Sequence, residues 1–279
     1  MIGLIKHARR PTKTVAVVVP MHNREELLPE EQISLRHLVH YLGKYDKYLV
    51  VPTGLEVNYP GFRIKRFSGK YFGSAKAYIR LQFQPSFYES FSEYKYILIY
   101  HLDALVFSDQ LMEWCEADFD YVGAPWIKHP EAPYAGRNEF EGKVGNGGFL
   151  LVKIQSCLKV IYSPGYRIDP RIHWERHYKS RPAHIKLLQL PRNYLRYLKV
   201  FNNARWEMAQ WQRSGDAFWA NRAKHYYPEF KIPSVETALR FAFESLPRYC
   251  FDRTNHTLPF GCHAWTRYDR EFWEPYLLK

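Results

Sequence analysis

Apolar runs in the first half of the chain predict strands that are buried on both faces. Thr14 to Pro20 is a β-branched run that a proline ends, and Tyr48 to Pro52 repeats this pattern. Tyr94 to Phe107 is almost continuously apolar and holds a single acid, Asp103, while Tyr121 to Ala124 is a shorter run of the same kind. Uninterrupted apolar runs are typical of strands that other elements cover on both sides.

Segments with helical spacing separate these runs. The segment 27–42 carries apolar residues three and four positions apart, and the segment 74–91 is predicted to be mostly helical with a break near Pro85. A weaker strand is predicted at 62–67, and a strand at 149–152 follows a loop rich in Gly and Asn at 144–148. Strands that alternate with helices are typical of βαβ units. The pattern therefore predicts an α/β fold with a mainly parallel central sheet flanked by helices.

The length and composition of the chain suit one domain. With 279 residues, 46% of them hydrophobic, the chain can bury one sizeable core. No apolar run approaches the roughly 20 residues of a membrane span, and Met1 to Lys13 lacks the apolar core of a signal peptide. Four irregularly spaced cysteines predict neither a disulfide framework nor a thiolate metal site. We therefore expect a cytoplasmic protein.

The stretch 165–213 fits no element of the predicted sheet and is interpreted as a basic insertion. Between Arg167 and Arg213 it holds eleven Lys and Arg against three acids, which gives +8 of the formal net charge of +12. The aromatic residues interleaved with these cations are Trp174, Tyr178, Tyr194, Tyr197, Phe201, Trp206 and Trp211. Such a mixture suits an anionic membrane surface, where each Lys or Arg contributes about 1 kcal/mol. A solvated surface insertion is the alternative.

The positive charge predicts an anionic partner, which can be nucleotide phosphates, an acidic lipid surface or nucleic acid. The sequence has no RRM, KH, zinc or helix-turn-helix signature, so nucleic acid is not the expected partner. It also lacks the motifs G-x-x-x-x-G-K-[ST], G-x-G-x-x-G, H-E-x-x-H and G-x-S-x-G. Because no glycine-rich phosphate loop is present, a nucleotide on this sheet must be held by a metal ion and by side chains.

Asp103 is the first candidate metal ligand. It lies where a buried strand should end, and ligands of α/β sheets gather just beyond the carboxyl ends of the strands. A hard divalent cation that bridges a diphosphate needs only one or two carboxylates from the protein. The alternative is an Asp that caps the following turn through backbone N–H groups.

Five short motifs carry a family resemblance. They are Tyr100-His-Leu-Asp-Ala-Leu-Val-Phe107, Tyr121-Val-Gly-Ala-Pro-Trp126, Gly145-Asn-Gly-Gly-Phe149, Gly215-Asp-Ala-Phe-Trp219 and Leu258-Pro-Phe-Gly-Cys-His-Ala-Trp265. In this order they resemble GT-A-type nucleotide-sugar-dependent glycosyltransferases, most closely a family of largely uncharacterised bacterial glycosyltransferases. The resemblance covers about residues 94–275, and Val15 to Arg24 is similar to the first nucleotide-binding strand and loop. It implies a single GT-A-like domain over 1–279, with a nucleotide-binding half at about 14–125 and an acceptor-side half at about 126–279.

The resemblance implies a donor site that binds a divalent cation. Asp103 matches the second Asp of the Asp-x-Asp motif that holds Mn²⁺ or Mg²⁺ on the donor diphosphate. His101 replaces the first Asp, and an imidazole there can contact the ribose or base of the nucleotide; a plain strand-end histidine is the alternative. His263 matches a late His that reaches the metal, against the alternative of a hydrogen-bonded core residue. Further donor contacts are expected at Pro20, His22, Asn23 and Arg24.

The acceptor side is expected to contain a glycine loop and a tryptophan. Asn146, Gly147 and Gly148 resemble the loop beside the acceptor sugar, where glycine lets the backbone approach a bulky polar ligand. An Asn-Gly hairpin turn between strands is the alternative. Trp126 would offer an apolar face to a sugar ring, although a buried core Trp would have the same sequence context.

Asp216 is the candidate catalytic base, because inverting transfer needs a carboxylate that takes the proton of the acceptor hydroxyl. The resembled family has a Glu-Asp pair here, and Gly215 replaces the first acid. A helix N-cap is the competing interpretation of Asp216, since a helical pattern follows.

Together these residues predict an inverting glycosyltransferase that uses a nucleoside diphosphate sugar, with a UDP-sugar as the first expectation. The expected acceptor is a glycan or a lipid-linked sugar in bacterial surface polysaccharide or glycoconjugate synthesis, and the basic insertion places the enzyme peripherally on the inner face of the membrane. Two alternatives stay open. One is a basic nucleic-acid-binding protein, and the other is an inactive sugar-nucleotide or glycan-binding module, which His101 and Gly215 suggest.

Overall fold

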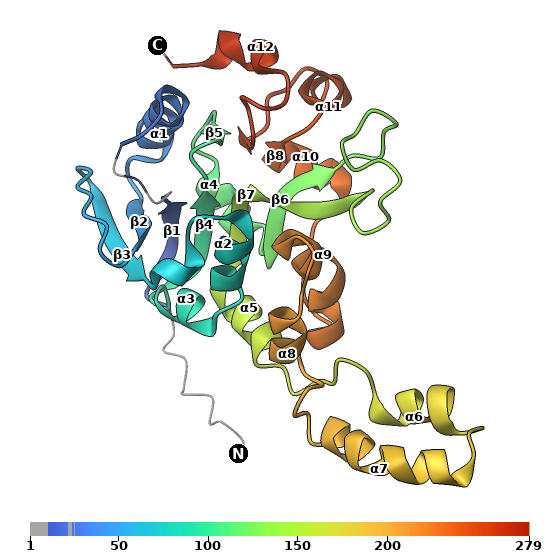
Figure 1. Cartoon of the computed structure of the whole chain (residues 1–279). Coiled ribbons are helices and arrows are strands. Elements are labelled where there is room, and N and C mark those ends of the chain that lie inside the picture. The colour runs from blue at the N-terminus through green and yellow to red at the C-terminus, as the bar shows by residue number, and fades with distance from the viewer. Residues whose placement is uncertain (1–10, 22–23, 25, 279) are drawn as a thin grey trace.

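A computed structural model describes residues 11–21, 24 and 26–278 (Figure 1). Its centre is a six-stranded sheet in the order β3-β2-β1-β4-β7-β6. The strands are β1 (Lys13–Pro20), β2 (Asp46–Pro52), β3 (Phe62–Phe67), β4 (Tyr94–Tyr100), β6 (Tyr121–Trp126) and β7 (Lys143–Lys153). The first four pair in parallel, and β7 runs antiparallel between β4 and β6. The predicted α/β fold with a mainly parallel sheet is therefore confirmed.

A second, three-stranded sheet lies beyond the carboxyl end of β4. It consists of β5 (Leu105–Val106), β9 (Gly261–Cys262) and β8 (Ala242–Phe243), in that order. Strand β9 pairs antiparallel with β5 and parallel with β8. Because each strand has only two residues, no periodicity in the sequence predicts it. This small sheet brings the C-terminal part of the chain back to the end of β4.

Helices cover both faces of the central sheet, so its strands are buried on two sides. One face carries α2 (Ala75–Gln82), α3 (Pro85–Glu89), α5 (Ile154–Ile161) and α9 (Gly215–Tyr226), and α1 (Pro29–Leu42) and α4 (Leu111–Glu116) cover the other. Along β1, Ala16 and Val18 pack in the first core, while Val15, Val17 and Val19 pack in the second. Full burial of such an aliphatic side chain stabilises the fold by about 1.5–3 kcal/mol. The continuous apolar runs are thus explained by two cores rather than one.

One segment follows the predicted pattern and another differs from it. The segment 74–91 forms two helices with the expected break near Pro85, because Pro85 begins α3 and cannot donate a backbone hydrogen bond to continue α2. The segment 144–148 is no loop but the first half of β7, which pairs with β6 through register shifts between Val122 and Pro125. The glycines therefore lie in an irregular strand of the central sheet.

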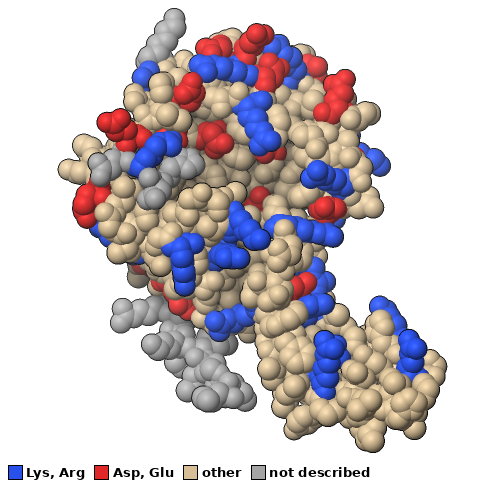
Figure 2. Space-filling model, in the orientation of Figure 1, with Lys and Arg blue, Asp and Glu red and all other residues tan. Residues whose placement is uncertain are grey.

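The basic insertion forms an arm that projects from the body. It consists of α6 (Pro170–Tyr178) and α7 (Ala183–Tyr197), and α8 (Ala204–Ala209) returns the chain to the body (Figure 1). The arm carries exposed apolar side chains, with Leu187 68% and Leu188 72% exposed, as well as Lys and Arg (Figure 2). Within residues 11–21, 24 and 26–278, no helix has both the length and the apolar character needed to cross a bilayer.

The C-terminal segment packs against the small sheet through short helices. These are α10 (Val235–Phe241), α11 (Pro247–Arg253) and α12 (Arg270–Trp273), and a 3₁₀ turn at Glu274–Tyr276 follows α12. A separate 3₁₀ turn at Gly69–Tyr71 lies between β3 and α2. Trp273 and Phe107, the residue after β5, stack with ring centroids 5.3 Å apart. This packing fixes the position of the segment that contains His263.

Candidate active site

The turn after β4 holds His101 and Asp103 between two other segments. The His101 N–H donates to the Gly148 carbonyl of β7 at 2.7 Å, and the Ala104 N–H donates to the His101 carbonyl at 3.0 Å. On the other side, the Trp265 N–H donates to the Asp103 carbonyl at 3.2 Å. The turn is therefore positioned by β7 and by the segment after β9.

His101, Asp103 and His263 form a cluster of possible metal ligands. One ligand atom from each residue lies within 4.8 Å of those from the other two. His263 Nε2 is 3.3 Å from Asp103 Oδ1, and the Asp103 side chain is 48% exposed while that of His263 is 14% exposed. The cluster is thus open to solvent on the Asp103 side. The structure brings together the three side chains that the sequence predicted at the donor site.

Glu244, the residue after β8, contacts the His263 ring nitrogen that does not face Asp103. Its Oε1 is 3.2 Å from His263 Nδ1, and its Oε2 accepts a hydrogen bond from Asn146 Nδ2. Burial alone would lower the pKa of His263, but hydrogen bonds to Asp103 and Glu244 outweigh burial and raise it to about 10. Burial acts to raise the pKa of Asp103, yet the hydrogen bond and charge of His263 lower it well below its usual value.

These contacts fit a divalent cation. The cluster offers a carboxylate oxygen and imidazole nitrogens, and a metal-bound histidine commonly donates its other N–H to a carboxylate, as His263 can to Glu244. Asp103 and Glu244 raise the pKa of His263, so they favour a positive charge between them. A bound divalent cation would supply such a charge. Two imidazoles and one carboxylate suit Mn²⁺ better than Mg²⁺, which prefers oxygen ligands.

The glycines of β7 make room for the acids and the histidine. A Cβ on Gly148, which has a φ of +142°, would lie 2.1 Å from His263 Nε2, and a Cβ on Gly147 would lie 2.4 Å from Asp216 Oδ1. Asn146 is buried and donates to Glu244. The close approach that requires glycine in this structure is therefore an approach of the Asp216 and His263 side chains. Contact of Asn146, Gly147 and Gly148 with an acceptor sugar stays a prediction. The residues 144–148 thus form neither the predicted loop nor the alternative hairpin turn, because they lie in an irregular strand.

Asp216 lies in the first turn of α9 and not at its N-cap, which is Ser214. Its Oδ2 accepts from Ser214 Oγ at 3.3 Å, and its Oδ1 faces Gly147. Burial raises the pKa of Asp216 to about 6, although a hydrogen bond from the Gly147 backbone and the charge of His263 act against the shift. A carboxylate whose pKa lies near neutrality is suited to accept and release a proton.

Trp126 lies apart from this cluster, in a buried pocket of aromatic side chains. It is 3% exposed, and its ring packs on Phe140 with the centroids 5.1 Å apart. This burial agrees with the alternative of a core tryptophan, because little of the ring is left for a sugar.

The predicted donor residues around the end of β1 are only partly described. Pro20 ends β1 and is partly exposed. Arg24 forms an ion pair with Glu31 of α1, and its Nε donates to the Glu26 carbonyl at 3.1 Å. His22 and Asn23 lie outside the described residues. In this structure Arg24 holds the start of α1.

Sequence reasoning missed two residues that border the cluster. Glu244 follows the apolar run Phe241-Ala-Phe243, and an acid at the end of an apolar run is the same signal that identified Asp103. Tyr78 of α2 places its ring against His101, with centroids 5.4 Å apart, and burial raises its pKa. No sequence signal distinguishes Tyr78 from other aromatic residues of an amphipathic helix.

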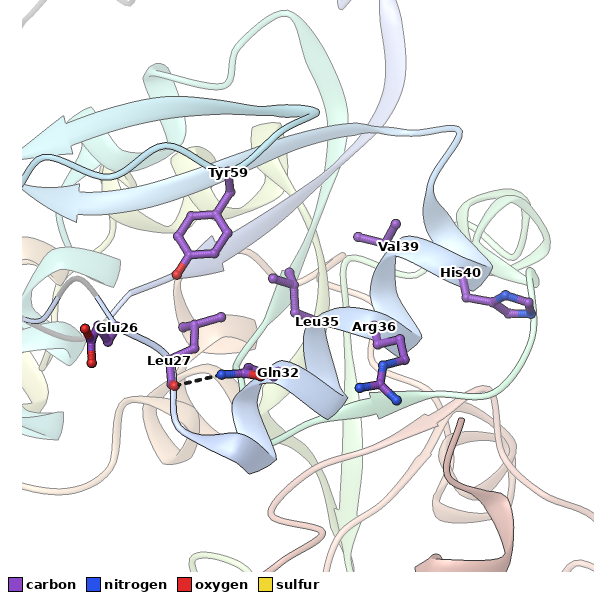
Figure 3. Close-up of a pocket in the computed structure, with 8 residues that line it drawn as sticks. All are labelled: Glu26, Leu27, Gln32, Leu35, Arg36, Val39, His40 and Tyr59. Atoms are coloured by element: carbon purple, nitrogen blue, oxygen red, sulfur yellow. Dashed lines mark hydrogen bonds between the residues drawn. The ribbon is translucent and has the colours of Figure 1, made fainter. Parts of the chain in front are cut away.

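A separate groove of about 780 Å³ opens beside α1 (Figure 3). Leu35 and Val39 of α1 line it, and Tyr59 of the β2–β3 connection faces them across it. Gln32 Nε2 donates to the Leu27 carbonyl at one end, at 3.3 Å. None of the residues of the His101, Asp103 and His263 cluster lines this groove, so it is distinct from the candidate site.

Comparison with known proteins identifies one protein family. A family model described as a protein of unknown function, DUF5672, matches residues 61–263. The matched range includes Asp103, Asp216, Glu244 and His263 and leaves out β1 and α1. No curated protein matches the sequence.

Solved structures that are similar to this chain are glycosyltransferases. The apo form of GlyE from Streptococcus pneumoniae TIGR4 has 12% identity and a TM-score of 0.41, over 95% of this chain and 60% of that chain. The galactosyltransferase LgtC in complex with donor and acceptor sugar analogues has 13% identity and a TM-score of 0.43, over 94% of each chain. A glycosyltransferase involved in glycosylation of the major capsid of PBCV-1 has 9% identity and a TM-score of 0.43, over 94% of this chain and 98% of that chain. This chain thus spans 60% of the length of the GlyE chain.

Proposed function

The chain belongs to the DUF5672 family, and we propose that it is a metal-dependent glycosyltransferase that moves a sugar from a nucleoside diphosphate to an acceptor hydroxyl. The observation that carries this proposal is the meeting of Asp103, His263 and Asp216 around the glycines of β7. A metal-ligand cluster and a carboxylate with a raised pKa are the two chemical parts that such a transfer needs. The five sequence motifs support the same activity.

Asp103 and His263 would hold the cation, with His101 as the third candidate ligand. A divalent cation supplies Lewis-acid stabilisation of the negative charge that grows on the diphosphate as it leaves. Glu244 keeps His263 turned toward Asp103, because it accepts at Nδ1 and leaves Nε2 to face the carboxylate. This orientation is the protein's contribution to the donor side.

Asp216 is the proposed base on the acceptor side. The acceptor oxygen forms a bond to the anomeric carbon of the donor sugar as the bond from that carbon to the diphosphate oxygen breaks. The hydroxyl proton goes to the Asp216 carboxylate, and the nucleoside diphosphate leaves with the electron pair. A direct displacement of this kind inverts the anomeric centre.

The finer assignments concern the substrates and the place of action. We expect a UDP-sugar as donor and a glycan or lipid-linked sugar as acceptor, in surface polysaccharide or glycoconjugate synthesis. The arm supports contact with an anionic membrane, because it combines Lys and Arg with exposed Leu187 and Leu188. A lipid-linked acceptor would be presented at such a surface.

Calorimetric titration with UDP, with and without Mn²⁺, tests the metal-dependent donor site. The parent protein should bind UDP more tightly with Mn²⁺, and Asp103→Asn should abolish this difference because it removes the charge and keeps the shape. Asp252→Asn is the matched control, since its side chain is 71% exposed and pairs with His256 in a surface contact. Unchanged Mn²⁺-dependent affinity in Asp103→Asn would contradict the assignment.

Product analysis tests the transfer itself. Release of free sugar from a UDP-sugar without acceptor would show that the protein is an enzyme and not an inactive sugar-nucleotide-binding module. The anomeric configuration of the first product, read by proton NMR, would then decide whether Asp216 acts in a direct displacement.

A further inference from the structure

A pocket with several positive charges lies at the base of the arm, away from the candidate active site. Its volume is about 470 Å³. Arg167 precedes α6, His173 lies in α6, and Arg192 and Arg196 lie in α7. Phe201 and Trp206 supply aromatic walls from the connection to α8 and from α8 itself. Residues from five consecutive segments therefore converge on one cavity.

The charges of this pocket are not balanced by acids that line it. None of the described residues lining the pocket is Asp or Glu. Two buried nitrogen atoms, Arg196 Nη1 and His173 Nε2, have no hydrogen-bond partner among the residues that the structure describes. A buried donor without an acceptor costs free energy, and neighbouring guanidinium groups repel one another. Accordingly, burial and the charges of Arg192 and Arg167 lower the pKa of Arg196.

The pocket is held in place before any ligand binds. Asn202 connects the two ends of the arm. Its Oδ1 accepts from the Ile168 N–H at 3.0 Å, and its Nδ2 donates to the Ile168 carbonyl at 2.8 Å. The Arg167 guanidinium lies 5.2 Å from the Trp206 ring centroid, and that of Arg196 lies 5.9 Å from the Phe201 ring centroid. Stacking on an aromatic ring restrains the guanidinium plane and leaves its edge free for hydrogen bonds.

We propose that this pocket binds a phosphate group, carried either by a soluble phosphate or by a lipid headgroup. A phosphate accepts paired hydrogen bonds from the planar guanidinium fork, and its charge of up to −2 offsets several cations at once. It would also supply acceptors to Arg196 Nη1 and His173 Nε2. The inference does not depend on the proposed transferase activity, because the pocket shares no residue with the cluster around Asp103.

Titration of the metal-free protein with inorganic pyrophosphate tests the site. The double variant Arg192→Gln, Arg196→Gln removes two of the charges, and Arg171→Gln, Arg176→Gln removes the same charge from exposed positions of α6. EDTA is present so that binding around Asp103 contributes little. The pocket variant should bind pyrophosphate at least tenfold more weakly than the parent, and the control should stay within twofold. Far-UV circular dichroism and the Tm establish that both variants are folded, and Arg192→Gln alone provides a milder change if the double variant unfolds.

Vesicles distinguish the two sources of phosphate. Sedimentation with phosphatidylglycerol vesicles, against phosphatidylcholine vesicles, is measured for the same proteins. Loss of pyrophosphate binding together with weaker sedimentation of the pocket variant than of the control assigns a lipid headgroup. Loss of pyrophosphate binding alone assigns a soluble phosphate. Pyrophosphate affinity within twofold of the parent in the pocket variant, or no binding by the parent, overturns the proposal.

Discussion

At the scale of single residues, the surroundings of Asp216 explain its raised pKa. Asp216 lies two residues after Ser214, which occupies the N-cap of α9 without a side-chain capping hydrogen bond. The Ser214 hydroxyl donates to the Asp216 carboxylate instead. Position 215 holds a glycine, and the charges that act on Asp216 come from His263 and Glu244. Burial is the largest cause of the raised pKa of Asp216, and the negative charge of Glu244 adds to it.

Replacing Asp216 by Asn should lower kcat by roughly 10²–10⁴, the usual effect of losing a positioned base. Donor affinity should be retained, because Asp216 is not one of the candidate metal ligands His101, Asp103 and His263. Steady-state kinetics with a UDP-sugar and its acceptor measure both effects. Turnover within about threefold of the parent would move the base to another residue.

The same carboxyl group should make stability depend on pH. Its pKa rises from an ordinary value of 3.8 to about 6 on folding, so the folded protein binds more protons than the unfolded chain between these values. Stability should therefore fall as pH rises from about 4 to about 6, and the contribution is then constant. Urea unfolding with EDTA at several pH values should show this extra fall in the parent and not in Asp216→Asn. Parallel pH curves for the two proteins would show that the pKa is not raised.

At the scale of elements, β7 joins the core of the sheet to the site. Its second half pairs with β4 in a regular antiparallel register, and its first half pairs irregularly with β6. The irregular part carries the glycines against which Asp216 and His263 lie. One strand thereby sets the positions of residues from α9 and from the end of β9.

Gly148→Ala should destabilise the protein by about 1–3 kcal/mol more than Gly142→Ala, as expected for overpacking. Both glycines have positive φ, but a Cβ meets His263 at position 148 and has open space at position 142. Denaturant unfolding measures the difference, and UDP titration with Mn²⁺ should show weakened binding for Gly148→Ala only. Equal unfolding free energies would mean that His263 does not lie against this strand.

At the scale of the whole molecule, apolar and positive surfaces coincide on the arm. Leu187, Leu188 and Tyr194 are each more than 60% exposed, on a projection that also holds much of the net positive charge. An exposed apolar patch beside cations is typical of a surface that contacts a membrane. The body, in contrast, buries its apolar residues around the two faces of the sheet.

Replacing Leu187 and Leu188 by Ser should weaken sedimentation with anionic vesicles several-fold and leave the Tm nearly unchanged, since neither side chain is buried. Leu28→Ser with Val39→Ser is the control, because these side chains are about half exposed, at the N-cap of α1 and within α1. UDP affinity should be the same in all three proteins. Equal vesicle binding by the arm variant and the parent would remove the membrane from the proposal.

The local pattern of the chain predicted the strands of the central sheet and the helices that cover them, because a continuous apolar run such as Tyr94 to Tyr100 is typical of a strand buried on both faces. It also placed Asp103 among the candidates, since an acid at the end of an apolar run stands out in a sequence, whereas Asp216 was found through the family resemblance. Only the tertiary structure decided which side chains meet. Asn146, Glu244 and His263 are joined by contacts across as many as 98 residues of chain and by two-residue strands without periodicity. The same holds for the cationic pocket and for Trp126, because burial and charge proximity depend on distances that sequence separation does not contain.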